Sequence, residues 1–245
     1  MNGNILEAQA SDFTKKLEET KMNIDSQFPW YPYGSLNNFI HLKNTFNKYS
    51  LDRLIGSSLK TLDIGAADGD LAFFLESLGY NADIIDYPPT NFNGLRGARL
   101  IKEKLNSGIN IYETDLDSQF PALQEKYGLI FFLGILYHLK NPYYILEQLS
   151  KSAENLIVST RIAKYTKDGA TLSNYPLAYL LNPDETNNDS TNYWIFSYKG
   201  LERIFERTGW YITDMFTVGD TLQSNPSDPH HDERAFALLK SKHWF

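Results

Sequence analysis

The sequence contains no cysteine. Disulfide bonds, thiolate nucleophiles and cysteine-ligated zinc sites are therefore excluded, and the absence is compatible with a reducing compartment. Basic residues are also in deficit, because 23 Lys and Arg stand against 30 Asp and Glu, which gives a net charge of −7. This balance disfavours a broad nucleic-acid surface and favours a small-molecule substrate.

Long apolar runs are absent as well. No stretch approaches the roughly 18 consecutive apolar residues of a membrane helix, and residues 1–17 lack the apolar centre of a signal peptide. We therefore predict a soluble cytoplasmic protein with no membrane partner. A chain of 245 residues with 42% hydrophobic content suffices for one sizeable α/β domain with additions. The sequence carries no signal for an oligomeric state.

The chain does contain a strand, a glycine-bearing turn, a helix and a second strand in direct succession. Leu59–Ile64 is short and apolar, a helix is predicted from Asp70 to a C-cap at Gly79, and Asn81–Ile85 is a second buried strand. This order builds a nucleotide or nucleoside pocket at the carboxyl end of a parallel sheet. Asp86, which ends the second strand, stands where a carboxylate reaches a ribose diol.

The remaining segments continue the alternation, which predicts a mostly parallel sheet flanked by helices. Further strands are predicted at 108–113, 128–133, 155–160, 210–218 and 234–239, and helices at 13–22, 95–106, 121–126, 141–150 and 198–207.

Two regions depart from this alternation. Residues 1–50 are predicted to form a helical and aromatic cap, and residues 51–245 the main domain, with an insertion at about 161–197. That insertion is too long for a structureless connection and is expected to be a lid or binding segment. The cap carries the aromatic run 28–33, in which Trp30 and Tyr33 are candidates to roof the active site. The alternative is that these aromatics only pack the cap on the main domain.

The turn at 65–69 decides between two kinds of cofactor site. It reads Gly-Ala-Ala-Asp-Gly and lacks the Gly-x-Gly-x-x-Gly pattern, so a nicotinamide-dependent dehydrogenase is disfavoured. With Asp63 before it, the segment resembles the first motif of class I S-adenosylmethionine-dependent methyltransferases, an acidic residue followed by Gly-x-Gly-x-Gly. The outer glycines Gly65 and Gly69 are kept, and Ala67 replaces the middle one.

A second string strengthens this resemblance. Residues 132–142 read FLGILYHLKNP. This string resembles the end of the family's fourth strand, and especially the corresponding string in the group that includes the tRNA uridine carboxymethyltransferases. The resemblance covers about residues 55–242. It implies a Rossmann-like, seven-stranded, mostly parallel sheet with an antiparallel last strand, beside the N-terminal helical cap. In that tRNA-modifying group the cofactor is a carboxylated S-adenosylmethionine.

The resemblance also implies where S-adenosylmethionine binds. Asp63 and the turn backbone would serve its methionine end, Asp86 its ribose, and Tyr87 and Asp115 its adenine, with Asp117 as the competing acid. The full set of implied cofactor residues is Asp63, Gly65, Ala66, Ala67, Gly69, Asp86, Tyr87, Asp115, Leu116, Leu133 and Gly134. The product would be S-adenosylhomocysteine.

His138 is the candidate general base, since an imidazole at this strand end could accept a proton from a hydroxyl acceptor. The alternative is a packed, hydrogen-bonded motif residue, because methyl transfer from a sulfonium depends largely on positioning. The candidate acceptor residues of this side are Tyr137, Arg161, Tyr193, Trp194 and His230, besides Trp30 and Tyr33 of the cap.

The string His230-His231-Asp232-Glu233 contains metal-ligand types, but adjacent residues rarely converge on one ion, so no metal is predicted. We predict an S-adenosylmethionine-dependent methyltransferase that acts on a small molecule, by direct in-line transfer to oxygen. The alternatives are a tRNA-modifying methyl- or carboxymethyltransferase and a non-catalytic cofactor-binding scaffold.

Overall fold

A computed structural model describes residues 1–56, 60–120, 123 and 125–244. The chain forms two compact units. The first comprises Met1–Asp115 with Lys126–Phe131, and the second comprises Leu116–Glu125 with Phe132–Phe245. The division expected between residues 1–50 and 51–245 is a different one and stays a prediction.

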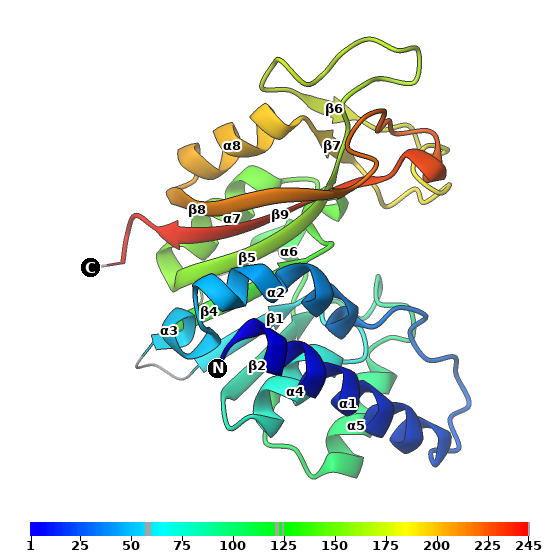
Figure 1. The fold of residues 1–245 in the computed structure, drawn as a ribbon. Helices are drawn as coiled ribbons and strands as arrows, with labels where there is room; N and C mark the ends of the chain where they lie inside the picture. The colour runs from blue at the N-terminus through cyan, green and yellow to red at the C-terminus, as the bar shows by residue number, and fades with distance from the viewer. Residues whose placement is uncertain (57–59, 121–122, 124, 245) are drawn as a thin grey trace. The chain divides into compact units, whose positions relative to one another are not determined.

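The first unit is built on parallel strands in the order β3-β2-β1-β4, of which β1, β2 and β4 are labelled in Figure 1. The strands are β1 (Lys60–Ile64), β2 (Asn81–Asp86), β3 (Asn110–Glu113) and β4 (Tyr127–Leu133), of which the part up to Phe131 belongs to this unit. Because all run the same way, the turn after β1 and the residues that follow β2 and β3 lie along one edge of the sheet.

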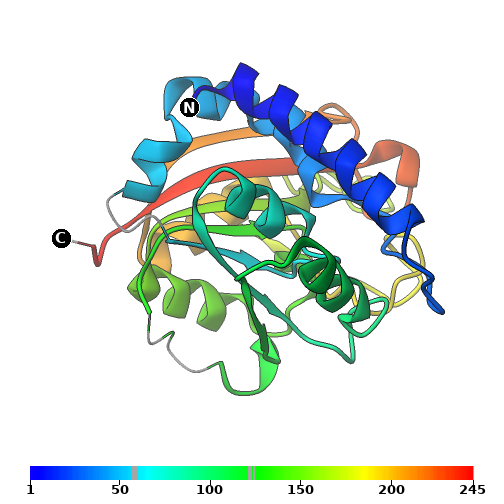
Figure 2. The same cartoon turned by 90° about the horizontal axis from the view of Figure 1, so that it is seen from below.

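Helices cover this sheet, and they are α1 (Gly3–Met22), η1 (Ser35–Asn38), α2 (Phe39–Lys48), α3 (Leu51–Ile55), α4 (Asp70–Ser77) and α5 (Arg96–Leu105). Helices α1 and α2 lie side by side in both views (Figures 1 and 2). The rings of Phe13 and Phe39 lie 5.6 and 5.5 Å from that of Phe74 on α4. The N-terminal segment therefore shares the apolar core of the first unit.

Helix α4 forms as its sequence predicts. Gly69 precedes it with a φ of 84°, Leu71, Phe74 and Leu75 are buried, and the chain turns at Gly79, whose φ is 90°. The apolar face of the helix packs on β1 and β2. This packing fixes the direction in which the turn at 65–69 leaves the sheet.

The second unit contains the antiparallel part of the fold. Strand β9 (Glu233–Ser241) lies between β5 (Ala153–Ile162) and β8 (Trp210–Gly219) and runs antiparallel to both. Two short strands, β6 (Ala178–Leu180) and β7 (Trp194–Phe196), extend the other side of β5. Its helices are α6 (Leu116–Gln119), η3 (Leu136–His138), α7 (Pro142–Ser152), α8 (Tyr198–Arg207) and η4 (Pro229–His231).

The predicted fold class is confirmed: the strands are mostly parallel, the last is antiparallel, and helices precede the sheet. The described residues form nine strands rather than seven, because the insertion at 161–197 contributes β6 and β7. The helix predicted at 121–126 lies partly outside the described residues. Strand β3 begins at Asn110, two residues later than predicted. None of the described helices has the length and hydropathy to cross a membrane.

Candidate cofactor and acceptor sites

The turn after β1 bends through three residues of positive φ: Gly65 at 72°, Ala67 at 57° and Gly69 at 84°. It is anchored to β2, since the Gly65 N–H donates to the Ile85 carbonyl at 2.8 Å. A Cβ on Gly69 would lie 2.7 Å from the Phe73 ring, so glycine is required there. Ala67 holds a backbone conformation that disfavours alanine and therefore needs support from its surroundings.

Asp86 supplies part of that support. Its Oδ2 accepts the Ala67 N–H at 3.1 Å and the Asn91 Nδ2 at 3.0 Å, and its Oδ1 accepts the Tyr87 N–H at 2.7 Å. Burial raises the pKa of Asp86, and these hydrogen bonds oppose the rise. A carboxylate has about four lone-pair sites, so one acceptor position remains for a hydroxyl group.

Asp63 is a buried carboxylate that lacks a partner on one of its oxygens. It is the penultimate residue of β1, is 3% exposed, and its Oδ2 has no hydrogen-bond partner among the described residues. Burial raises the pKa of its carboxyl well above the ordinary value of 3.8, and the charges of Asp70 and Asp86 raise it further. A cation brought to this position would compensate the buried charge.

The two acids that are candidates for binding adenine, Asp115 and Asp117, differ in position and in hydrogen-bond partners. Asp115 follows β3 and is half-buried, and the preceding Thr114 donates its N–H to the Asp86 carbonyl at 3.0 Å. Asp117, in the second unit, accepts the N–H groups of Lys140 and Asn141 at 2.9 and 3.1 Å. Asp117 thus holds the start of α7, and Asp115 is the better candidate for a ligand.

The cap aromatics occupy unlike positions. Trp30 is half-buried, with the Lys21 Nζ 5.1 Å from its ring centre and the Phe28 ring 5.5 Å away. Tyr33 is 77% exposed. An acceptor role for either stays a prediction.

In the second unit, Leu133 ends β4 and Gly134 follows it. The Gly134 N–H donates to the Ser159 carbonyl of β5 at 2.9 Å. A Cβ at Gly134 would lie 3.5 Å from Arg234 Nη1 and 3.7 Å from the Tyr137 hydroxyl. These two side chains therefore flank the end of β4.

His138 is half-buried, and its ring centre lies 4.3 Å from that of Tyr137. Its Nδ1 lies 3.2 Å from the Thr191 carbonyl and 3.1 Å from the Thr191 hydroxyl. Since a carbonyl only accepts, an Nδ1–H that donates to it leaves Nε2 as a proton acceptor. Burial lowers the pKa of His138, and the charge of Arg234 lowers it further, while Thr191 and Asp189 oppose the shift. The imidazole is thus favoured in its neutral form.

Two arginines lie near Tyr137 and differ in their partners. Arg161 is 3% exposed, and its Nε lies 2.9 Å from Asp232 Oδ1. Arg234 is half-buried over the Tyr137 ring, 5.9 Å from its centre, and forms no ion pair with any described residue. Arg161 is therefore balanced within the fold, whereas Arg234 is available to an anion.

The other candidates are less closely grouped. The Tyr193 N–H donates to the Tyr137 carbonyl at 2.8 Å, and the buried indole N–H of Trp194 has no partner among the described residues. The His230 side chain is exposed on η4. Neighbouring His231 pairs with Asp220. The backbone N–H of Gln223, then His231 and the backbone N–H of Leu222, lower the pKa of Asp220 to about 2. In the described part of the chain, no three His, Asp or Glu side chains are placed to share a metal ion.

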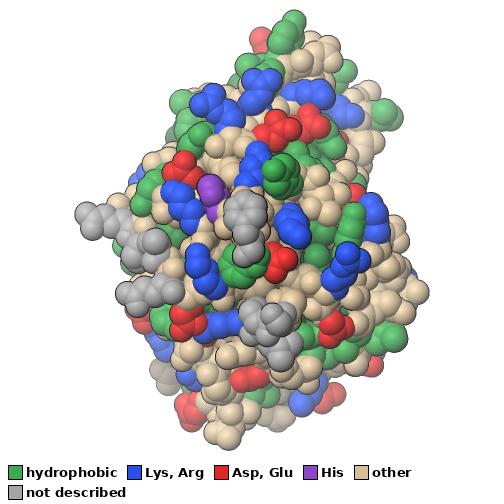
Figure 3. All heavy atoms as spheres, turned by 90° about the vertical axis from the view of Figure 1, so that its left-hand side faces the viewer, with side chains coloured by type: hydrophobic (Ala, Val, Ile, Leu, Met, Phe, Trp, Pro, Cys, Tyr) green, Lys and Arg blue, Asp and Glu red, His purple; other side chains and the backbone are tan. Residues whose placement is uncertain are grey.

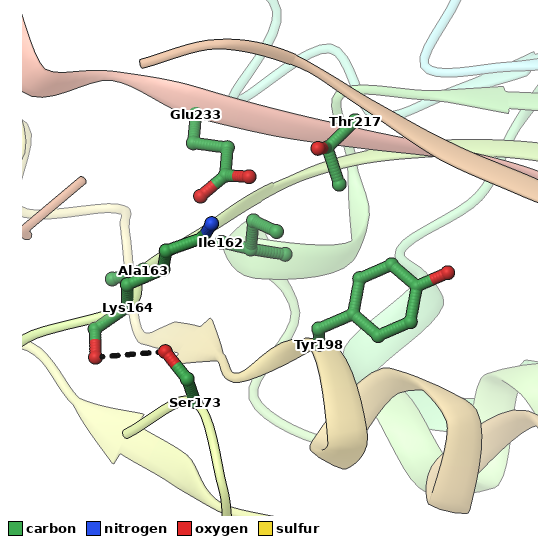
Figure 4. A pocket seen from close by; sticks show the side chains of 7 residues that line it. All are labelled: Ile162, Ala163, Lys164, Ser173, Tyr198, Thr217 and Glu233. Carbon is green, nitrogen blue, oxygen red and sulfur yellow. Dashed lines mark hydrogen bonds between the residues drawn. The ribbon is translucent and has the colours of Figure 1, made fainter. Parts of the chain in front are cut away.

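The second unit also has a cavity of about 320 Å³ at the end of β5 (Figure 4). Glu233 reaches into it from β9, and Tyr198 projects from the start of α8 on the other side. Glu233 pairs with Ile162, whereas Arg234 pairs with Arg161. Because side chains alternate along a strand, the cavity lies on the opposite face from the two arginines.

A family model described as a methyltransferase domain matches residues 19–214, most of the chain. The chain belongs to this family of S-adenosylmethionine-dependent methyltransferases. Three likenesses to individual proteins accompany the match. The tRNA U34 carboxymethyltransferase of Campylobacter hominis is 29% identical over 156 residues, which cover 58% of this chain and 54% of that protein. This chain thus spans about half the length of this curated relative.

Two crystal structures share the fold of this chain. The N-terminal domain of EvdMO1, which holds S-adenosylhomocysteine, is 12% identical with a TM-score of 0.59 over 98% of each chain. TehB from Haemophilus influenzae is 18% identical with a TM-score of 0.51, over 81% of this chain and 66% of that one.

Several residues of these clusters carry no motif signal. No motif marks out Lys21, Asn91 or Arg234 in the sequence. Only the contacts in the structure place them in the candidate sites. Asp68 stands inside the recognised turn, but at a variable position of the motif. A sequence signal exists only for Asn91, which follows two prolines in a predicted loop, where asparagine side chains often bond the backbone.

Proposed function

We propose that the methyltransferase transfers the methyl group of S-adenosylmethionine to a hydroxyl oxygen of a small molecule. The observation that carries the cofactor half of this proposal is Asp63, a buried carboxylate with an unpartnered oxygen at the end of β1. Its surroundings suit a cation, and S-adenosylmethionine carries both an ammonium and a sulfonium group. When bound, this cofactor supplies an electrophilic methyl group.

In this proposal, different residues of the first unit bind different parts of the cofactor. Asp63 and the backbone of Gly65, Ala66, Ala67 and Gly69 hold the methionine end. Asp86 uses its remaining acceptor position for a ribose hydroxyl. Tyr87 and Asp115 lie beside the adenine. Leu116, Leu133 and Gly134 belong to the second unit, and their role as cofactor residues stays a prediction.

His138 is the proposed general base. Its lowered pKa keeps the imidazole neutral, and the contact of Nδ1 with Thr191 leaves Nε2 to take a hydroxyl proton. In the proposed in-line transfer, the bound cofactor would supply the methyl group, and His138 Nε2 would take the proton that the acceptor hydroxyl gives up. Tyr137, Tyr193 and Trp194 are the proposed acceptor-side residues.

The acidic composition supports a small acceptor over a polynucleotide. The proposal includes a cytoplasmic location, in keeping with a chain without cysteine. It also treats residues 1–50 as a cap and the insertion at 161–197 as the segment that selects the acceptor.

Calorimetric titration with S-adenosylmethionine and S-adenosylhomocysteine tests the cofactor assignment. We expect both to bind and Asp86→Ala to weaken binding by about 1.5–3 kcal/mol, the usual contribution of hydrogen bonds to a charged acceptor. Asp12→Ala is the matched control, since Asp12 is an exposed acid of α1 that forms an ion pair with Lys15. No binding of either compound at high micromolar concentration would contradict the proposed function.

Unchanged affinity in a folded Asp86→Ala protein would contradict only the ribose assignment. A panel of hydroxylated metabolites then tests turnover through release of S-adenosylhomocysteine. Tight cofactor binding without methyl transfer to any acceptor would favour the scaffold interpretation instead.

A second candidate, carboxymethyl transfer, is favoured by Arg234. A carboxylated cofactor adds a negative charge, and Arg234 is a half-buried guanidinium beside Gly134 without an acidic partner among the described residues. The Campylobacter hominis relative, by its name, carries out this reaction on tRNA.

Competition between the two cofactors tests this candidate. If carboxymethyl transfer is the reaction, the wild type prefers carboxylated S-adenosylmethionine, and Arg234→Met loses that preference by about 1.5–3 kcal/mol while still binding the ordinary cofactor. Lys240→Met, on the same strand, is the control, because Lys240 lies in an exposed pair with Glu154. If the wild type binds ordinary S-adenosylmethionine as tightly as the carboxylated cofactor, the carboxymethyl-transfer candidate is ruled out.

A further inference from the structure

The residue in the turn with most partners is Asp68, between Ala67 and Gly69. It is 2% exposed, and its Oδ2 accepts from the Lys21 Nζ at 2.8 Å and from the Tyr31 N–H at 2.9 Å. The Lys21 side chain is itself only 20% exposed. These contacts join the turn to a segment more than 30 residues earlier in the chain.

A second aspartate makes a parallel connection on the far side of Gly69. Asp70 is 6% exposed, and its Oδ2 accepts the Leu36 N–H at 3.0 Å. Burial raises the pKa of Asp70, while the Leu36 hydrogen bond and the charge of Lys21 lower it. Residues 21–36, here called the strap, therefore contact Asp68 of the turn through Lys21 and Tyr31, and the first residue of α4 through Leu36.

The other oxygen of Asp68 faces α5. Its Oδ1 accepts the Asn93 Nδ2 at 2.7 Å, and Asn93 in turn accepts the Gly97 N–H at 3.1 Å. A Cβ at Gly97 would lie 2.0 Å from the same Oδ1, so only glycine allows this approach. Asp68 is thus held between the strap and the loop that follows β2.

Aromatic contacts run along the strap in the same direction. The Tyr31 ring lies 5.7 Å from that of Phe92, and the Arg96 guanidinium lies 4.7 Å from the Phe28 ring. The strap consequently packs on the residues after β2 as well as on the turn after β1. Both segments belong to the proposed cofactor site.

We propose that the strap sets cofactor affinity by holding the turn at 65–69 in its binding conformation, with Asp68 as the positioning residue. The turn needs such support because Ala67 sits at positive φ, where alanine is disfavoured and persists only if its surroundings enforce it. If the strap is released, the binding-competent turn becomes less populated and apparent affinity falls by that fraction. The inference rests on the proposed function, since it takes the turn as a cofactor site.

The test measures S-adenosylhomocysteine affinity by calorimetry in Lys21→Met, Asp68→Asn and the double variant. Each single variant is expected to bind at least about fivefold more weakly, the lower end of coupling between linked sites. The double variant should lie close to the single ones, because both changes disable one contact. Lys21→Arg keeps the charge and should restore most of the affinity. Gly97→Ala, which displaces Asp68 from the other side, should repeat the loss.

Lys15→Met is the matched control, because Lys15 lies on the same helix in an exposed pair with Asp12. Hydrogen exchange supplies a readout independent of the ligand: the strap (residues 21–36) and the turn at 65–69 should exchange faster in Lys21→Met than in Lys15→Met. Folded Lys21→Met and Asp68→Asn proteins that bind as tightly as wild type would overturn the inference, as would an equal loss in Lys15→Met. A wild type that binds no S-adenosylhomocysteine would overturn the proposed function, while exchange at 65–69 would still report on the strap.

Discussion

The carboxyl group of Asp63 lies beside two other aspartates, and no described donor reaches its Oδ2. Its raised pKa has a definite consequence for stability. Because the folded pKa lies above the unfolded value of 3.8, the native state holds this proton more tightly than the unfolded state does. The stabilisation is fully present below pH 3.8 and is lost as pH rises through the folded pKa. Near neutral pH, Asp63 therefore opposes folding.

Asp63→Asn should for this reason stabilise the protein while it weakens cofactor binding. We expect a gain of roughly 0.5–2 kcal/mol near pH 7, the usual range for one stabilising substitution. The gain should shrink toward pH 4, where the wild-type carboxyl is protonated. Denaturant unfolding at several pH values measures it, with Asp12→Asn as the exposed control. A variant less stable than wild type at pH 7 would show that the Asp63 charge is compensated within the fold.

At the scale of elements, strongly periodic segments could be predicted from the sequence. Helix α4 and the strands around it follow local patterns of apolar residues, and their bounds agree within a few residues. Strands β6 and β7 could not be predicted, because each has three residues and depends on pairing with the other and with β5. Ala163, Leu172, Leu181 and Ile195 form a small core of their own here, assembled from residues far apart in sequence.

The candidate site divides in the same way. Asp63, Asp86 and the turn glycines stand at strand ends, where local pattern and family resemblance suffice. The contact of Lys21 with Asp68 joins positions 47 residues apart. Arg234 is a candidate ligand because it forms no ion pair with any described residue, which its sequence does not show. Such features depend on tertiary packing, which leaves no periodic trace in a sequence.

At the scale of the whole molecule, charge bears most directly on the acceptor. The net charge is −7, and on the face drawn in Figure 3 basic side chains are interspersed with acidic ones. Binding to a polynucleotide draws its affinity from many neutralised phosphates, which a mixed surface does not provide. An acceptor small enough to be recognised by the residues around Tyr137 places no such demand on the surface.

Titration of this chain with unmodified tRNA at several salt concentrations tests the point. If the acceptor is a small molecule, we expect no saturable binding below about 100 μM at physiological salt, since even non-specific nucleic-acid binders usually fall within that range. A micromolar complex whose affinity falls steeply with salt would contradict this and favour a polynucleotide acceptor. The slope of log affinity against log salt would then count the phosphates in contact, at about 0.7 to 0.9 per phosphate. Measured with Arg234→Met, the slope would show whether Arg234 is one of those contacts or serves only a ligand beside Gly134.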